Sequence, residues 1–233
     1  MADRPTSLDF YFDVMCPYAY QSSKWIRLVR SETGLDVRWR FFSLEEVNRE
    51  AGKKHPWERA WSYGFSQMRI GALLRRDGME VVDRWYAAVG KAFHEDARPT
   101  HVVDVQREVL AEAGFDPGLV DAALADPTTS DEVRGDHEHA VREHGAFGVP
   151  TMVLPIPGAS DGAVASVYQQ LVPAPDDPET AVAMFDAMVA FHRFPGLFEL
   201  KHPKLNADVV TVAATFAPYL AARDWRTIEN PAR

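Results

Sequence analysis

Residues 10–20 read FYFDVMCPYAY, and this stretch decides the fold. Over residues 8–14 the side chains alternate between two faces, which is the period-two pattern of a β-strand. Pro17 suits the first turn of a helix, where its missing N–H costs nothing, and Gly34 is typical of a helix end. Cys16 is therefore expected to lie where a strand turns into a helix.

The sequence that follows predicts a second strand and then a long helical region. Residues 35–41 alternate again, so the chain begins with a strand, a crossover helix and a parallel strand. Ser43 and Glu46 have the spacing of a capping box, which marks a helix start. From there to about Gly145 the pattern is helical and is interrupted by Gly and Pro, with helices expected at 55–76, 79–94, 100–113, 117–125 and 130–144.

Strand character returns in the last third of the chain. Residues 150–154 and 163–172 predict a hairpin around a turn region at 155–162. A capping Asp and a first-turn Pro begin a helix at 177–193, and a last helix is expected at 207–222.

This order of elements predicts an α/β, thioredoxin-like fold with an all-helical insertion. Residues 1–44 and 146–233 are expected to form the discontinuous thioredoxin-like domain, and residues 45–145 the helical insertion domain.

Composition limits the classes of function. The chain has 233 residues and a formal net charge of -9, which argues against nucleic-acid binding because phosphate contacts need clustered Lys and Arg. No signal peptide is apparent, and no apolar run approaches the length of a membrane span. The single cysteine excludes an intrachain disulfide and fits a reducing compartment. We therefore expect a cytoplasmic protein that binds neither nucleic acid nor membrane.

Cys16 is the main candidate for chemistry. A helix N-terminus carries partial positive charge and free N–H groups, and both stabilise a thiolate, so a lowered pKa and a nucleophilic role are expected. The alternative is an inert core thiol, since cysteine is among the most buried residue types. The position between strand and helix, followed by Pro17, favours the reactive cysteine.

Three stretches carry a resemblance to known enzymes. Residues 10–20 resemble the active-site segment of the DsbA-like thioredoxin superfamily, in which Cys-Pro-x-Cys opens the first helix. Residues 147–151, FGVPT, resemble the cis-proline loop that faces this cysteine. Residues 194–201, FPGLFELK, are similar to the end of the actinobacterial mycothiol-dependent nitroreductases of the same superfamily. In order along the chain, the resemblance covers about residues 7–201.

The resemblance implies a thiol-dependent oxidoreductase with a low-molecular-weight thiol, mycothiol or glutathione, as cofactor, and no metal. It makes Cys16 the catalytic nucleophile and places the thiol partner against Pro17, Tyr18, Val149, Pro150 and Thr151. One departure matters: the second cysteine of the motif is Ala19 here. An internal disulfide is thus impossible, and a monothiol mechanism is expected, in which a second small thiol regenerates Cys16.

A sibling branch gives a second hypothesis. Kappa-class glutathione transferases and 2-hydroxychromene-2-carboxylate isomerases begin with a stretch similar to residues 9–13, followed by Ser-Pro-Tyr. Cys16 stands at the position of that serine, which hydrogen-bonds the cofactor sulfur, and Ala19 fits this branch better than the dithiol one. Cys16 would then orient a cofactor thiolate that adds to an electrophilic substrate. A third hypothesis is a binding protein that lost redox activity together with the second cysteine.

Other candidate side chains are assigned structural roles. His137, His139 and His144 lack the i, i+4 spacing of a helical metal site, so helix packing or a cleft lining is expected for them. The aromatic residues of the helical region are expected to be mostly core, with a minority lining a groove for a flat apolar substrate. The apolar residues of the 207–222 helix must be buried, so this helix either closes a cleft or forms a homodimer interface.

The remaining polar residues of interest are expected at the surface. Asp13 lies three residues before Cys16 and could accept protons there, but a strand-end Asp is expected to face solvent. Partial exposure is expected for three single histidines near helix ends: His55, His94 and His101. Three arginines are expected to form a solvated face, with the alternative that one of them binds a carboxylate of the thiol partner: Arg69, Arg75 and Arg76.

Overall fold

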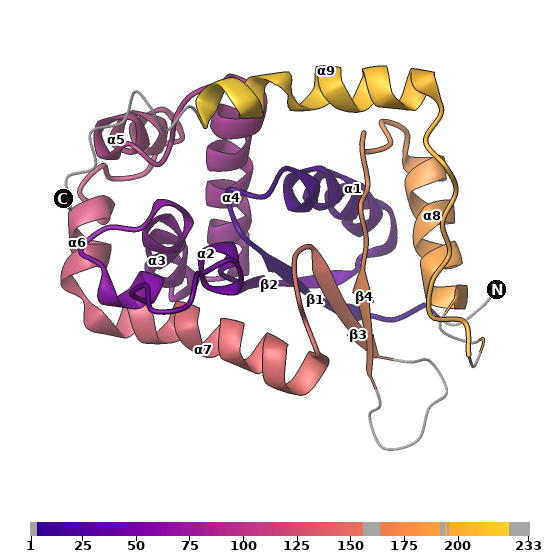
Figure 1. Cartoon of the computed structure of the whole chain (residues 1–233), viewed down its shortest axis with the longest axis horizontal. Coiled ribbons are helices and arrows are strands. Elements are labelled where there is room, and N and C mark those ends of the chain that lie inside the picture. Colours follow the sequence, from indigo (N-terminus) through magenta and orange to yellow (C-terminus); the bar gives the residue numbers. More distant parts are fainter. Residues whose placement is uncertain (1–3, 156–163, 192–193, 195, 224–233) are drawn as a thin grey trace.

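The structure is a computed structural model and describes residues 4–155, 164–191, 194 and 196–223 (Figure 1). The described strands form one sheet in the order β2-β1-β3-β4, in which β1 and β2 run parallel and the other neighbours antiparallel. Their bounds are β1 (Ser7–Phe12), β2 (Asp36–Phe41), β3 (Thr151–Pro155) and β4 (Val164–Tyr168). Helix α1 (Pro17–Thr33) connects the parallel pair, as the sequence predicted.

Helices fill the chain between β2 and β3, so the predicted α/β fold with a helical insertion is confirmed. They are α2 (Leu44–Val47), the 3-10 helix η1 (Pro56–Glu58), α3 (Tyr63–Arg75), α4 (Met79–His94), α5 (Val103–Glu112), α6 (Leu119–Ala125) and α7 (Pro127–His144). Two more helices follow β4, namely α8 (Pro178–Phe191) and α9 (Asn206–Ala222).

Several predicted boundaries shift. The strand expected at 163–172 is shorter and ends at Tyr168, and most of the turn expected at 155–162 lies outside the described residues. Of the predicted capping box, Ser43 accepts the Glu46 N–H at 3.2 Å. The Glu46 carboxylate instead contacts Arg49 and His55, because both side chains come within reach once the chain folds back on α2.

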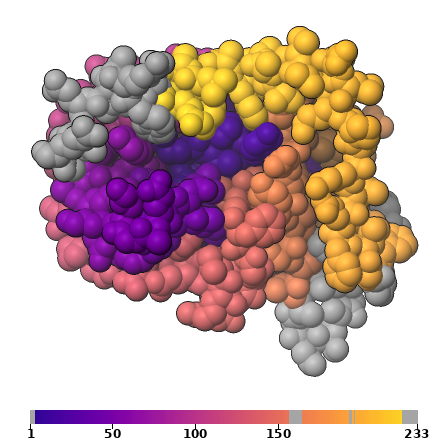
Figure 2. Space-filling view, viewed as in Figure 1, coloured from indigo at the N-terminus to yellow at the C-terminus, as the bar shows by residue number. Residues whose placement is uncertain are grey.

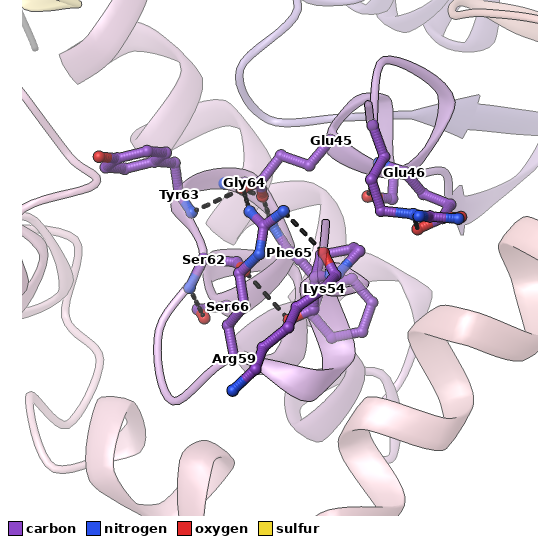
Figure 3. A network of polar contacts seen from close by, with 12 residues as sticks. Glu45, Glu46, Lys54, Arg59, Ser62, Tyr63, Gly64, Phe65 and Ser66 are labelled. Atoms are coloured by element: carbon purple, nitrogen blue, oxygen red, sulfur yellow. Dashed lines mark hydrogen bonds and ion pairs between the residues drawn. The ribbon is translucent and has the colours of Figure 1, made fainter. Parts of the chain in front are cut away.

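The predicted helix at 55–76 is wrong in its first part, where the chain forms η1 and an extended stretch before α3 begins. The start of α3 is determined from outside this segment, by Glu45 of α2 (Figure 3). The Glu45 carboxylate accepts the N–H groups of Tyr63, Gly64 and Phe65 at 3.3, 2.9 and 2.9 Å. These are donors that a helix start leaves without a backbone partner, and a negative charge is favourable beside them. Because the capping side chain lies 18–20 residues earlier in the chain, no local pattern signals it.

One hydrophobic core runs through the sheet and the inserted helices. Phe12 of β1 stacks on Tyr86 of α4 with ring centroids 3.9 Å apart, and Trp39 of β2 meets Tyr86 edge-on at 5.5 Å. Arg27 of α1 lies over the Trp39 and Tyr86 rings and pairs with a carboxylate of α4. The insertion therefore supports the two parallel strands, the first of which leads into the active-site turn.

Helix α9 lies across one edge of the molecule, near the start of α1 (Figure 1). On its inner side, Phe216 meets Tyr18 edge-on at 5.1 Å, and Tyr219 stacks on His94 at 5.5 Å. On its outer side Val210 is 69% exposed. Within the single chain, the expectation that the apolar residues of this helix are buried is thus wrong for Val210, because none of the described elements packs over that side chain.

Candidate active site

Cys16 is the N-cap residue of α1 and follows directly on the turn that ends β1. Its backbone N–H donates to the Asp13 carbonyl at 3.0 Å, and Pro17 occupies the first helical position. The Ala19 N–H donates to Cys16 Sγ at 3.5 Å, so the sulfur takes the role that an oxygen has in an ordinary N-cap. The predicted position between strand and helix is confirmed.

A loop far along the chain faces this sulfur. The Cys16 thiol donates to the Val149 carbonyl at 3.3 Å, and the Val149–Pro150 peptide bond is cis. Thr151 begins β3, is buried, and donates from Oγ1 to the Gly148 carbonyl at 2.7 Å. The fold thus brings Cys16 beside the predicted loop, although the two contacting residues lie 133 positions apart.

Burial dominates the electrostatics of the thiol. Cys16 is 5% exposed, and burial raises its pKa to about 12, against the opposite effect of the Ala19 and Tyr18 N–H groups. The negative charge of Asp13 raises this pKa as well. The expectation of a lowered pKa is therefore wrong for this closed site, since desolvation of a thiolate outweighs two amides. The sulfur is held as a thiol that donates to Val149.

Asp13 is fully buried, so the expectation that it faces solvent is wrong. Its Oδ1 accepts the Met15 N–H at 2.9 Å, and its Oδ2 accepts the Leu44 N–H at 2.8 Å. Burial raises the pKa of this carboxyl to about 7, although both amides act to lower it. From α3, Gly64 approaches so closely that a Cβ there would lie 2.6 Å from Oδ1. One carboxyl group thus joins the active-site turn, the start of α2 and the start of α3.

Two histidines of the insertion are also buried, and the expectation of partial exposure is wrong for both His94 and His101. Burial lowers the pKa of each to about 4, so both are neutral at pH 7. His94 Nε2 lies 2.9 Å from the Val14 carbonyl and must donate to it, because a carbonyl only accepts. Its ring stacks on Tyr20 and Tyr219, so α4 contacts the chain two residues before Cys16.

Aromatic side chains from separate segments lie around the site. Tyr18 contacts Phe216 of α9, and Phe147 lies 4.7 Å from Tyr168 of β4, centroid to centroid. Figure 2 shows an indigo surface, from the N-terminal part of the chain, recessed between α9, the orange β3–β4 region and the violet inserted helices. Sequence reasoning did not assign Tyr168 or Tyr219 to the site, since only the fold brings them near it.

The expected solvated face holds for Arg76, which is exposed, whereas Arg69 and Arg75 are half-buried. Arg69 donates to the Ala123 carbonyl at 2.9 Å and so caps the end of α6. Arg75 pairs with Asp136 of α7 and lies over the Phe41 ring. Both side chains therefore hold helices of the insertion together: Arg69 binds the end of α6, and Arg75 binds a carboxylate of α7.

A separate hollow of about 600 Å³ lies between α2, η1 and α7, away from the predicted site residues. His137, one of its lining residues, accepts the Ser43 N–H on Nδ1 at 3.3 Å and so joins α7 to the start of α2. Among the described residues, no group of three or more His, Cys, Asp or Glu side chains is arranged to hold a metal ion. Nor does any helix in the described part of the chain combine the length and apolar character needed to cross a membrane.

Comparison with known proteins decides the family. Residues 15–202 match the model of the Rv2466c-like family, described as mycothiol-dependent nitroreductase Rv2466c. The chain belongs to this family. The matched region contains Cys16, the loop at Val149–Pro150 and the stretch at 194–201. As a member of the Rv2466c-like family, the chain is an enzyme of thiol-dependent redox chemistry.

Individual relatives agree with this assignment. The uncharacterised protein Rv2286c of Mycobacterium tuberculosis is 46% identical over 225 residues, which are 97% of this chain and 94% of the relative. A probable DsbA oxidoreductase from Streptomyces coelicolor superposes with a TM-score of 0.54 at 20% identity, covering 85% of this chain and 95% of that one. A 2-hydroxychromene-2-carboxylate isomerase gives a TM-score of 0.56 at 17% identity, covering 80% and 96%. These similarities confirm the DsbA-like thioredoxin fold.

Proposed function

We propose that this enzyme reduces its substrate through Cys16 alone, with mycothiol as the thiol that supplies the electrons. One observation carries the proposal: the chain's single cysteine lies with its sulfur 3.3 Å from the carbonyl of the cis-proline loop. Because Ala19 replaces the second cysteine of the motif, a disulfide at Cys16 has to be resolved by an external thiol. The mycothiol-dependent family supports mycothiol over glutathione. We place the reaction in the cytoplasm, because a single free cysteine fits a reducing compartment.

In this proposal the thiol partner lies along Val149, Pro150 and Thr151 and takes over the Val149 carbonyl. The Cys16 thiol then loses its acceptor, while the Ala19 N–H still points at the sulfur. That amide favours the thiolate, so binding of the partner lowers the pKa of Cys16 and activates it only when the partner is present. Pro17 holds the first turn of α1, Tyr18 supplies a wall of the recess, and the insertion at 45–145 closes its other side.

The simplest substrate for this chemistry is a mixed disulfide of mycothiol. The Cys16 thiolate attacks the mycothiol sulfur, and the substrate thiolate leaves and takes up a proton. Mycothiol is now joined to Cys16 by a disulfide. A second mycothiol gives up its thiol proton and attacks the mycothiol sulfur, which releases oxidised mycothiol and restores the Cys16 thiolate. Two electrons pass to the substrate, and two mycothiol molecules end as one disulfide.

Intact-mass spectrometry tests the proposal. The purified enzyme is incubated with oxidised mycothiol and, separately, with oxidised glutathione. We expect one mycothiol adduct per chain, removed by excess reduced mycothiol. Since Cys16 is the single cysteine, Cys16→Ala is a complete negative control and an adduct needs no further mapping. If no adduct forms while both thiols still bind, the redox mechanism is refuted.

A specific observation also favours the second hypothesis, a thiol-dependent transferase or isomerase. In the structure Cys16 is a protonated hydrogen-bond donor, which is the role that a serine has in the kappa-class branch. Cys16→Ser separates the two mechanisms. A donor role predicts that this variant keeps substantial turnover, because a hydroxyl also donates, whereas the redox role predicts that turnover is lost together with the adduct.

We further propose that the enzyme is a homodimer formed through its outer C-terminal face. Eight large apolar side chains of this face are between 40% and 92% exposed: Phe194, Leu197, Phe198, Leu200, Leu205, Val209, Val210 and Leu220. Monomeric proteins rarely leave so many large apolar side chains exposed together, and a second copy of the chain would cover them. Figure 2 shows the yellow-orange surface of this region as continuous along the top and right of the molecule.

Light scattering coupled to size-exclusion chromatography tests this surface. We expect a dimer for the wild type and a monomer for the double variant Phe198→Ser, Leu200→Ser. Val47→Ser serves as the control, because Val47 is exposed on α2, on a different part of the molecule. A wild type that is monomeric at high micromolar concentration refutes the dimer.

A further inference from the structure

Asp13 has an unusual position for a carboxyl group. It is fully buried, three residues before Cys16, and both of its oxygens accept backbone N–H groups from different segments, Met15 of the active-site turn and Leu44 of α2. The backbone carbonyl of the same residue accepts the Cys16 N–H at 3.0 Å. Through main chain and side chain together, this one residue fixes the turn that carries the thiol.

The groups facing Asp13 do not neutralise its charge. From α1 it faces the Cys16 thiol, from α2 the carboxylate of Glu45, and from α9 the Tyr219 hydroxyl. Burial raises the pKa of Tyr219 most, Arg223 acts to lower it, and the charges of Cys16 and Asp13 raise it further. From α3 the backbone of Gly64 approaches it, and glycine carries no charge. Two buried acids that lie close together without a cation between them resist carrying two negative charges at once.

We propose that Asp13 is a positioning residue for Cys16: its carboxyl group holds the active-site turn, and its negative charge opposes ionisation of the thiol. The effect of Asp13 on catalysis rests on the proposed function, in which Cys16 has to become a thiolate. Asp13 and Cys16 then behave as a coupled pair that carries mainly one negative charge, and neutralising Asp13 makes the thiolate easier to form.

The rate of Cys16 alkylation by iodoacetamide, measured from pH 5 to pH 10, tests this coupling. In the wild type the logarithm of the alkylation rate should rise with pH and level off near pH 7, where Asp13 loses its proton. The rate levels off because the new carboxylate charge raises the pKa of the Cys16 thiol. It should rise again about one pH unit higher. In Asp13→Asn the rise should be continuous, and above pH 8 the variant should react about tenfold faster than the wild type.

Asp9→Asn is the matched control, since Asp9 lies on β1, just before the turn that holds Asp13, but pairs with Arg38. In this variant the alkylation rate should still level off near pH 7. The proposal is overturned if Asp13→Asn keeps the level region, or if it only slows alkylation at every pH, as a purely structural residue would. If Asp13→Asn does not fold, the pH profile of the wild-type alkylation rate still tests the proposal. A rate that rises without levelling off between pH 5 and pH 10 would overturn the coupling. Iodoacetamide reports on the thiol without mycothiol, so failure of the mycothiol adduct would leave this result standing.

Discussion

Replacing Gly64 by Ala should destabilise the enzyme at its active-site turn. The new Cβ would lie 2.6 Å from Asp13 Oδ1 and 3.1 Å from Met15 Cγ, whereas non-bonded heavy atoms prefer about 3.5–4.0 Å. Asp13 cannot turn away, because each of its oxygens holds a backbone N–H group. The start of α3 and the turn before Cys16 therefore have to separate by roughly 1 Å.

The magnitude follows from two opposing effects. Overpacking of this kind costs about 1–3 kcal/mol, while replacing Gly by Ala in a helix gains about 1 kcal/mol. Gly135 of α7 isolates the second effect, since a Cβ there meets nothing within 4 Å. We expect Gly135→Ala to be about 1 kcal/mol more stable than the wild type. Gly64→Ala should be about 1 kcal/mol less stable, so the two variants differ by roughly 2 kcal/mol.

Differential scanning calorimetry measures this difference. For a chain of this size, 2 kcal/mol corresponds to about 4–8 °C in Tm. Gly64→Ala should also change the rate of Cys16 alkylation at pH 8, because the turn that carries the thiol moves, whereas Gly135→Ala should leave it unchanged. Equal Tm values for the two variants would refute the close approach between Gly64 and Asp13.

Three further changes give defined outcomes. Thr151→Val removes the 2.7 Å hydrogen bond to the Gly148 carbonyl and should cost about 1–2 kcal/mol in urea unfolding; an unchanged midpoint would contradict this. Glu45→Gln keeps an acceptor but removes the charge at the start of α3, and should cost about 1 kcal/mol by the same assay, more than a surface Glu→Gln change. For His94, burial lowers the pKa to about 4 against an ordinary 6.5, so the unfolded chain binds the proton first and stability falls as pH falls from 6.5 to 4. His94→Gln should make this fall shallower by about 1.4 kcal/mol per pH unit, and a slope equal to that of the wild type would show that His94 is not the group responsible.

The sequence by itself determined the parts that depend on neighbouring residues. Alternation before Cys16, Pro17 after it and Gly34 at the helix end specified the strand, turn and helix, and the structure reproduces them with Gly34 in the left-handed conformation at φ 71°. The order of elements and the three motifs also sufficed for the fold class and for the family. Periodicity, capping and turn chemistry act over a few residues, so they can be read along the chain.

The tertiary structure alone decided the state of the active site. Helix position predicted a thiolate at Cys16, but burial of the sulfur outweighs the helix N-terminus and keeps the thiol protonated. Asp13 and His94 looked like surface residues in the sequence and became buried for the same reason, since elements distant in the chain pack over them. Desolvation depends on every atom that excludes water from a group, and most of those atoms belong to residues far away in sequence, so no local pattern contains it.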